Sequence, residues 1–525
     1  MTPGCRPLAQ TGHRRIVMFS TGCARRLQVT SIRHYRGQPV ADAAHPVEDS
    51  AGRCGAALNA MNLHLAVLLV YAAILMGVGL WIGRRVRSST DFFVAGRRLG
   101  PSLLFSTMLA ANIGAGSTVA AAGLGYADGL SAWWWVGSAG LGSIVLAFWI
   151  GPRIRRIAAD QGLHTLGDYL EYRFGEHVRA TITVLLWMGT LAILAAQIIG
   201  IGWILNVVVG LPPWLGCLIG GGVVIVYFTA GGLLTAAWVN AVQLVVLLAG
   251  FLVALPLTVA SAGGWGAIQT ATHAVDDYWN VWQGGSSGWF YLAMLGPAFI
   301  ISPGLLQKTY GARDDRTVRL GVGLNAAVLL VFAALPPLLG MIARAVEPGL
   351  DNPELALPTL LMQALPPAVG ALGLAAIFSA EVSSSDAILF MLATSLSQDL
   401  YRRYVDPDAS DGQVLKVARR AAVAGGILGT GLAVGAASMV SVLGLFYNLL
   451  TVSLFVPVLG GLYTRRVGPA EAMGAIAGGV GTYVAVEVLA MGEPVLGMTP
   501  AMIGLLGALA GCGLTAGARS GAPRR

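Results

Sequence analysis

Long apolar stretches separated by short polar ones run along almost the whole chain. Stretches of about 20 residues, the length that a helix needs to cross a bilayer, recur between residues 63 and 517. They predict thirteen transmembrane helices, at 63–83, 101–125, 131–151, 180–207, 214–230, 236–260, 288–308, 318–342, 367–397, 419–437, 441–463, 470–491 and 498–517. The pattern therefore predicts an all-α polytopic membrane protein that has the lipid bilayer as a partner.

Composition supports this fold class. The 525 residues are 56% hydrophobic and only 11% charged, whereas soluble globular proteins carry about 25% charged residues. The 71 glycines suit close packing of membrane helices. The net charge of +8 does not indicate nucleic-acid binding, because the basic residues are spread over short loops between apolar stretches.

The distribution of basic residues predicts the orientation. From residue 61 onward, 24 lysines and arginines lie in the loops after odd-numbered spans and in the tail, and only Arg344 lies on the opposite side. Cytoplasmic loops carry the excess of lysine and arginine. We expect a multi-pass protein of the plasma (inner) membrane, with its N-terminus outside and its C-terminus in the cytoplasm.

The first sixty residues differ from the rest, since they contain eight arginines and no stretch long enough to span. We expect a leader at 1–60, either disordered or upstream of a true start at Met61. A transit peptide is the alternative, but Asp42, Glu48 and Asp49 count against it.

Residues for membrane-embedded enzyme chemistry are missing from the predicted spans. All seven histidines lie in the leader, in loops or at span edges, and no HExxH motif occurs. The five cysteines have no metal-binding spacing. We therefore expect a protein that is not an enzyme and has no organic cofactor.

Two of the predicted spans contain residues that interrupt helices. The second has Asn112, Gly114 and Gly116 at its centre, and the seventh contains Gly296–Pro297 and Ser302–Pro303–Gly304. Proline removes a backbone donor and costs about 3 kcal/mol inside a helix. The two spans lie five helices apart, an odd number, so matching halves would be inverted, as in transporters with inverted repeats. Ordinary proline kinks and glycine packing are the alternative.

The ninth span, which contains SAEVSSSDAILF, is unusually polar for a membrane helix. In a helix, Ala380, Ser383 and Ser384 share a face. Two hydroxyls and a carbonyl there, together with carbonyls from the broken second span, would place five neutral oxygens around a small cation such as Na⁺. Serines used for helix packing are the alternative.

Several stretches resemble the sodium:solute symporter family, which includes sodium/galactose, sodium/proline, pantothenate and choline transporters. The resemblance covers residues 61 to about 466 and rests on DFFVAGRRLGP (91–101), SAWWWVG (131–137), HTLGDYLEYRFG (164–175), YFTAGGLLTAAWVNAVQ (227–243) and SAEVSSSDAILFMLATSLSQDLYRR (379–403). It implies a LeuT-like core of two inverted five-helix repeats. The expected order is the leader, a first helix and loop (61–100), repeat 1 (101–260), repeat 2 (288–463), two trailing helices (470–517) and a cytoplasmic tail (518–525).

The resemblance also implies a function and a sodium site. It implies a sodium-coupled symporter that imports a small organic solute by alternating access. The implied sodium ligands are the carbonyls of Ala110, Ile113 and Ala380 and the hydroxyls of Ser383 and Ser384. Many family members carry an aspartate where this chain has Asn240. That departure favours one Na⁺ per cycle and puts the strength of coupling in doubt.

Ten residues are candidates for substrate contact or coupling. Acidic residues inside a membrane are functional candidates by default, so Glu381 would hold an amino group of the solute, bind a proton, or only form hydrogen bonds. The full set is Asn112, Ser117, Gln197, Asn240, Phe299, Ser302, Glu381, Asp386, Tyr447 and Asn448. The run Trp133–Trp135 is interpreted as an interfacial aromatic belt.

Three other functions stay open. A proton-coupled or uncoupled carrier would use Glu381, and a transporter-like nutrient sensor is more remote, because few residues follow the last span. A channel is disfavoured, because the sequence has no repeated filter or ring of charges. The sequence does not identify the solute or the oligomeric state.

Overall fold

The structure is a computed structural model that describes residues 63–74, 76–77, 99–436, 438–492 and 494–521. The predicted leader and most of the first loop lie outside the described residues. So do the side chains of residues 229–242, which include Asn240.

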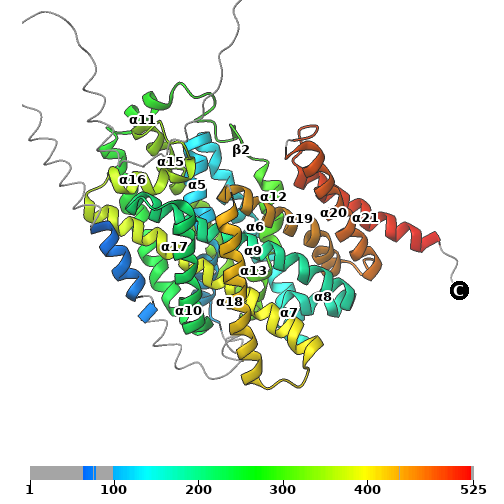
Figure 1. The fold of residues 1–525 in the computed structure, drawn as a ribbon. Coiled ribbons are helices and arrows are strands. Elements are labelled where there is room, and N and C mark those ends of the chain that lie inside the picture. Colours follow the sequence, from blue (N-terminus) through cyan, green and yellow to red (C-terminus); the bar gives the residue numbers. More distant parts are fainter. Residues whose placement is uncertain (1–62, 75, 78–98, 437, 493, 522–525) are drawn as a thin grey trace, which may run out of the picture. The chain divides into compact units, whose positions relative to one another are not determined.

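The first half of the described chain is helical throughout (Figure 1). A short apolar helix, Leu63–Ile74, comes first. The elements that follow are α4 (Pro101–Asn112), η3 (Ala115–Ser117), α5 (Val119–Asp128), η4 (Gly129–Ala132), α6 (Trp133–Val145), η5 (Leu146–Ile150), α7 (Gly151–Asp160), α8 (Leu166–Phe174), α9 (Glu176–Val209), α10 (Pro213–Ser261) and α11 (Trp265–Thr272). Here η5 is a π-helix, and η3 and η4 are 3₁₀-helices.

The second half begins with a small hairpin and returns to helices. It comprises β1 (Gln283–Gly284), β2 (Ser287–Gly288), α12 (Tyr291–Ile300), α13 (Pro303–Tyr310), α14 (Asp315–Phe332), α15 (Leu335–Val346), η6 (Pro353–Leu355), α16 (Ala356–Gln363), α17 (Pro367–Thr394), the π-helix η7 (Ser395–Val405), α18 (Asp411–Gly435), α19 (Met439–Tyr463), α20 (Pro469–Ala490) and α21 (Pro500–Gly521). The strands β1 and β2 are antiparallel, with Gln283 opposite Gly288 and Gly284 opposite Ser287.

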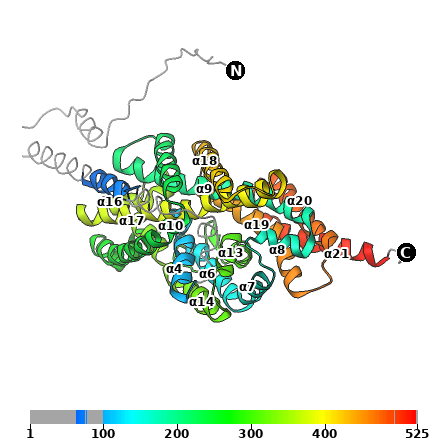
Figure 2. The same ribbon diagram turned by 90° about the horizontal axis from the view of Figure 1, so that it is seen from below.

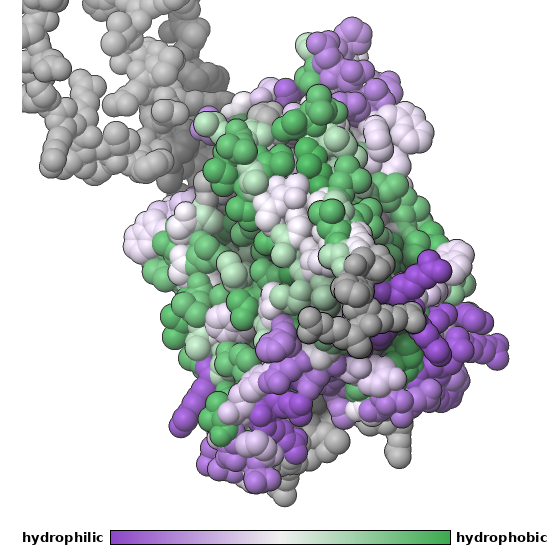
Figure 3. Space-filling view, turned by 90° about the vertical axis from the view of Figure 1, so that its right-hand side faces the viewer, coloured by the Kyte–Doolittle hydropathy of each residue, from purple (hydrophilic) through white to green (hydrophobic). Residues whose placement is uncertain are grey.

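Long apolar helices dominate the described residues. Within the described ranges, nine stretches are long and apolar enough to cross a membrane: Ala115–Asp160, Glu176–Val209, Gln243–Ser261, Asp315–Val346, Pro367–Val405, Gly412–Gly435, Met439–Tyr463, Pro469–Ala490 and Pro500–Ala518. On the face drawn in Figure 3, apolar side chains cover the middle and hydrophilic ones gather toward the two ends. This distribution fits a protein whose middle section lies in lipid.

The predicted boundary between the fifth and sixth spans is wrong, since α10 is one helix of 49 residues. No proline or charged residue occurs between 227 and 243 to end it. At 1.5 Å per residue, α10 is about two and a half times as long as the ~30 Å hydrocarbon layer is thick. Its early residue Gly221 faces Thr430 of α18, and its later residue Gly250 faces Ala376 of α17. The two predicted spans are therefore successive parts of one helix.

The trailing helices α20 and α21 lie together at one edge in both ribbon views (Figures 1 and 2). A side chain on Gly478 would come 2.5 Å from the carbonyl oxygen of Gly507, and one on Gly511 would come 2.1 Å from that of Gly474. Such close approach of two membrane helices requires glycine at the contact. The pair packs on α19, where a side chain on Gly479 would come 2.1 Å from the carbonyl oxygen of Val452.

The segment between α10 and α12 folds back on the end of α5. The Tyr278 hydroxyl donates to the carbonyl oxygen of Gly125 over 2.9 Å. The Asp128 carboxylate accepts hydrogen bonds from Ser286 (2.8 Å) and Ser287 (2.6 Å), at the turn between β1 and β2. These contacts hold the segment against the helix that follows the first interrupted span.

Candidate functional site

The second predicted span is interrupted at Ile113 and Gly114. Helix α4 ends at Asn112, and both following residues have extended backbone, with φ −105° and ψ 101° at Ile113 and φ −150° and ψ −159° at Gly114. Backbone N–H and C=O groups at such an interruption need partners from elsewhere. The predicted break is confirmed, and its polar groups meet side chains from α6, α9 and α17.

Three of the five predicted sodium ligands, Ala110, Ile113 and Ser384, meet at this break. The Ser384 hydroxyl lies 3.0 Å from the carbonyl oxygen of Ile113 and 3.5 Å from that of Ala110. The neighbouring Ser383 hydroxyl lies 3.1 Å from the carbonyl oxygen of Ala380, one turn earlier on α17. All five residues are buried. Neutral oxygen atoms of this kind suit a hard cation and lack the sulfur and imidazole ligands that softer metals prefer.

Gly114 has no room for a side chain. A Cβ atom there would lie 2.3 Å from Ser384 Oγ and 2.5 Å from Gln197 Oε1. Gln197 Oε1 accepts a hydrogen bond from the Ala115 N–H over 2.8 Å. Helices α9 and α17 thus approach the interrupted backbone closely enough for their side chains to satisfy it.

Glu381 lies between the break and α9. Its carboxyl group is buried, and its Oε1 is 3.1 Å from the Thr118 hydroxyl, which donates to it. A Cβ atom on Gly200 would lie 3.1 Å from Glu381 Cδ. Glu381 is not among the residues that line the cavity on the other side of the break. The structure therefore places this acid behind the break, in contact with α5 and α9.

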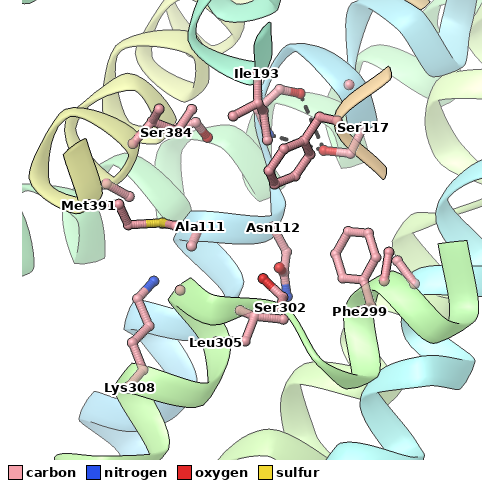
Figure 4. Close-up of a pocket in the computed structure, with 18 of the residues that line it drawn as sticks. Ala111, Asn112, Ser117, Ile193, Phe299, Ser302, Leu305, Lys308, Ser384 and Met391 are labelled. Carbon is pink, nitrogen blue, oxygen red and sulfur yellow. Dashed lines mark hydrogen bonds between the residues drawn. The ribbon is translucent and has the colours of Figure 1, made fainter. Parts of the chain in front are cut away.

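A cavity of about 280 Å³ opens beside the break. Figure 4 shows Asn112 and Ser117 from the first interrupted span, Phe299 and Ser302 from the second, and Ser384 from α17 around the same space. The candidates that line it are Asn112, Ser117, Gln197, Phe299, Ser302, Asp386 and Tyr447. Most other lining side chains are apolar or aromatic. The cavity therefore offers an apolar space with a few polar groups, which is typical of small-molecule sites.

Two of the other candidates, Asn448 and Glu381, do not face this cavity. Asn448 points away from it, and its Nδ2 donates to the Tyr483 hydroxyl of α20 over 3.3 Å. Glu381 lies behind the break, as described above. Asn240 is part of α10, but its side chain lies outside the described ones.

The second break is shifted from its predicted place. Helix α12 continues through Pro297 and ends at Ile300, and α13 begins at Pro303. The interruption is therefore confirmed at Ser302–Pro303, whereas Gly296–Pro297 lies inside a helix. Proline loses one hydrogen bond but does not always end a membrane helix, since neighbouring groups can satisfy the freed carbonyl.

The interpretation of the three tryptophans as an interfacial belt is wrong for Trp135. Trp135 is buried and lines the cavity. Its indole N–H donates to the carbonyl oxygen of Gly116 over 2.8 Å, and its ring lies 6.1 Å from that of Tyr447. Ala139, one turn later on α6, also lines the cavity, but the sequence alone does not indicate which face of the helix points inward.

Lys308, which lies at the edge of the seventh predicted span, also lines the cavity. Its Nζ donates to the carbonyl oxygen of Thr107 over 2.7 Å and so joins α13 to α4. The two segments are also joined by the Leu99 N–H, which donates to the carbonyl oxygen of Gly311 over 3.1 Å. The position of Lys308 at a span edge gave no sequence-based indication that it faces inward.

Comparison with known proteins identifies relatives of the chain. It is 26% identical to a sodium/glucose cotransporter of Vibrio parahaemolyticus over 69% of this chain and 73% of that protein. It is 27% identical to the sodium/pantothenate symporter of Escherichia coli (strain K12) over 79% and 88%, respectively. The high-affinity proline transporter PutP of Bacillus subtilis (strain 168) is 26% identical over 66% and 76%.

Solved structures show that the fold is that of LeuT-fold transporters. A Na⁺-coupled sialic acid symporter, solved in a substrate-bound outward-open state, superposes with a TM-score of 0.73. The alignment has 18% sequence identity and covers 87% of this chain and 97% of that one. Mhp1 in its inward-facing conformation superposes with a TM-score of 0.51 and 15% identity over 82% of this chain and 92% of that one.

The profile of the sodium:solute symporter family matches residues 92–481. This segment includes both interrupted spans, the serines of α17 and every described residue of the cavity from Leu99 to Leu450. The chain is a multi-pass membrane protein and belongs to the sodium:solute symporter family.

Proposed function

We propose that this protein imports a small organic solute together with one Na⁺ per cycle, by alternating access across the plasma (inner) membrane. The observation that carries the proposal is the approach of the Ser384 hydroxyl of α17 to the carbonyl oxygens of Ile113 and Ala110 at the first break. Ser383 and Ala380, which are neighbours on α17, would complete a set of five neutral oxygens. In this proposal Na⁺ binds there between α4 and α17, and the positive-inside pattern supports an N-terminus outside and a C-terminus in the cytoplasm.

The sodium site and the cavity are contiguous, which supports direct coupling between ion and solute. Gly114 of the break and Ser384 of α17, which contacts the break, both line the cavity. A cation that orders these residues therefore also orders one wall of the solute site. Coupling of this kind is reciprocal, so the solute must raise the affinity for Na⁺ as much as Na⁺ raises the affinity for the solute. A membrane potential of 100 mV adds about 2.3 kcal/mol per charge moved inward.

The cavity supports a solute with an apolar or ring-shaped body and few polar groups. Aromatic side chains of Trp135, Phe299 and Tyr447 form part of its wall. Polar contacts are available from Ser117, Ser302 and the other polar lining residues described above. The relatives are named for glucose, pantothenate and proline, so the family alone does not select one solute for this chain.

The proposal is tested by measuring the thermal stability of the purified protein with candidate solutes, in Na⁺ buffer and in K⁺ buffer. A ligand that binds the folded state raises stability by mass action. We expect the true solute to raise the melting temperature only in Na⁺, and we expect Ser383→Ala to lose that shift. If the solute raises the melting temperature equally in Na⁺ and K⁺ and in Ser383→Ala, sodium is not part of the mechanism, and the protein is a proton-coupled or uncoupled carrier.

A further inference from the structure

Glu354 belongs to η6, in the loop between α15 and α16, and is only 5% exposed. Both of its carboxylate oxygens accept hydrogen bonds. Its Oε2 accepts a hydrogen bond from the Trp203 indole N–H of α9 over 2.8 Å. Its Oε1 accepts from the Ser438 hydroxyl at 2.9 Å, from the Met439 N–H at 2.8 Å and from the Val440 N–H at 3.3 Å. One carboxyl group thus joins the loop to two helices that are far apart in the sequence.

The contact with α19 is made at the start of that helix. Met439 and Val440 are its first two residues, and their N–H groups have no partner within the helix. A carboxylate at this place satisfies them and interacts favourably with the helix dipole. Farther along α19, Leu443 and Tyr447 line the cavity. By holding the start of α19, Glu354 therefore helps to position the cavity wall that α19 forms.

The same loop also packs on α5, the helix that follows the first break. A Cβ atom on Gly123 would lie 3.1 Å from the carbonyl oxygen of Pro353 and 3.2 Å from Glu354 Cα. Through η6 and Glu354, the loop contacts α5, α9 and α19 at once. The residues that line the cavity include Leu99 and Lys308, and none of η6 is among them.

We propose that Glu354 is a positioning residue that holds α5, α9 and α19 together and so keeps the cavity closed at the end that η6 covers. Opening toward that side breaks its bonds to Trp203 and to the start of α19. The inference rests on the proposed alternating-access transport. In that mechanism, Glu354 would influence how often the cavity opens to one side of the membrane rather than to the other.

The test measures access to the cavity from each side of the membrane. The reporter is Val136→Cys, at a cavity-lining position of α6, in the full chain with its five native cysteines replaced by alanine. A membrane-impermeant thiol reagent is applied in Na⁺ to intact cells and to inside-out vesicles. The variants are Glu354→Gln and, because the first may fold poorly, Trp203→Phe, which removes only one donor. The matched control is Glu347→Gln, which alters an exposed acid of the same loop.

We expect Glu354→Gln to raise labelling from the side that η6 covers and to lower it from the other side, which changes the ratio of the two rates about tenfold. Trp203→Phe should shift the ratio in the same direction by less, and Glu347→Gln should leave it unchanged. An unchanged ratio in both test variants, or an equal shift in the control, overturns the role of Glu354 while alternating access stands. A reporter that the reagent reaches from only one side, in the unaltered chain and in every variant, overturns alternating access and this inference with it.

Discussion

The two interrupted spans differ in how their backbones are satisfied. The first break receives side chains from three helices, namely Ser384 of α17, Gln197 of α9 and Trp135 of α6. At the second break, no side chain caps the start of α13, and Ser302 faces the cavity. Helix α12 is linked to α19 one turn before Pro297, where the Thr451 hydroxyl donates to the carbonyl oxygen of Met294 over 2.7 Å.

This difference suggests that the two breaks have separate functions, which we call the division between the breaks: the first binds the ion and the second contacts the solute. At the first break the Ser384 hydroxyl lies near the carbonyl oxygens of Ile113 and Ala110, and neutral oxygens suit a hard cation. The second presents Phe299 and Ser302 to a larger space, which suits a solute. If the division holds, changes at the first break should act mainly on sodium, and changes at the second should act mainly on the solute.

The largest effect is expected for Gly114→Ala. Its Cβ atom would lie 2.3 Å from Ser384 Oγ and 2.5 Å from Gln197 Oε1, and overpacking of this kind costs about 1–3 kcal/mol or more. Sodium-driven uptake should fall about a hundredfold. The matched control at the second break is Gly304→Ala, whose Cβ atom meets the Met391 side chain, with Sδ at 2.8 Å. Because that chain is flexible, uptake should fall only a few-fold, and equal losses would refute the comparison.

Ser384→Ala should weaken sodium rather than the solute. The substitution removes the hydroxyl that approaches Ile113 and Ala110. Loss of one polar contact to a charged group costs about 1.5–3 kcal/mol, so the Na⁺ concentration for half-maximal uptake should rise about 10- to 100-fold.

The control for this prediction is the neighbouring Ser385→Ala. The Ser385 hydroxyl is also buried, but it donates to the carbonyl oxygen of Glu381 within its own helix over 2.7 Å. Its loss should leave the sodium dependence within a factor of about three. A larger change for Ser385→Ala than for Ser384→Ala would place the ion elsewhere.

Phe299→Ala should act on the solute at the second break. The Phe299 ring lies 5.5 Å from the Tyr447 ring, and both line the cavity. Loss of a packed aromatic side chain should raise KM for the solute about tenfold, with little change in the sodium dependence. The control is Phe148→Ala, which removes a half-exposed phenylalanine of η5 and should leave KM for the solute unchanged. If Phe299→Ala changes the Na⁺ concentration for half-maximal uptake but not KM for the solute, the division between the breaks is wrong.

The smallest effect is expected for Trp135→Phe. Phenylalanine keeps the aromatic wall but removes the indole N–H that donates to the carbonyl oxygen of Gly116. A single hydrogen bond is worth about 1 kcal/mol, so uptake should fall about fivefold. Trp133→Phe is the matched control, since its N–H bonds to Leu330 in α14 at 3.3 Å, away from the break. If the control loses as much uptake, the bond to Gly116 has no special role.

Much of the fold could be predicted from the sequence because lipid imposes a simple rule. A membrane helix must be long and apolar, so most helices follow from hydrophobic runs alone. The rule fails at α10, where the apolar run 227–243 lacks the residues that usually end a helix. It also fails at Pro297, because the consequence of a proline depends on the groups around it, which belong to other segments.

The candidate site was predictable where residues lie on one helix or match a known motif. The serines of α17 share a face by helical geometry, and family resemblance pointed to Ala110 and Ile113. By contrast, the inward direction of Lys308 and Trp135 depends on how helices rotate against one another. Asn448 and Tyr447 are adjacent in sequence yet face α20 and the cavity, respectively, and only tertiary packing decides between these directions.

Direct binding of radiolabelled Na⁺ to the purified protein tests the central claim most directly. We predict saturable binding of one ion per chain, which is lost or strongly weakened in Ser384→Ala and in Ser383→Ala and retained in Ser385→Ala. Wild-type binding that survives both ligand changes, or that is equally lost in Ser385→Ala, would contradict a sodium site at the first break.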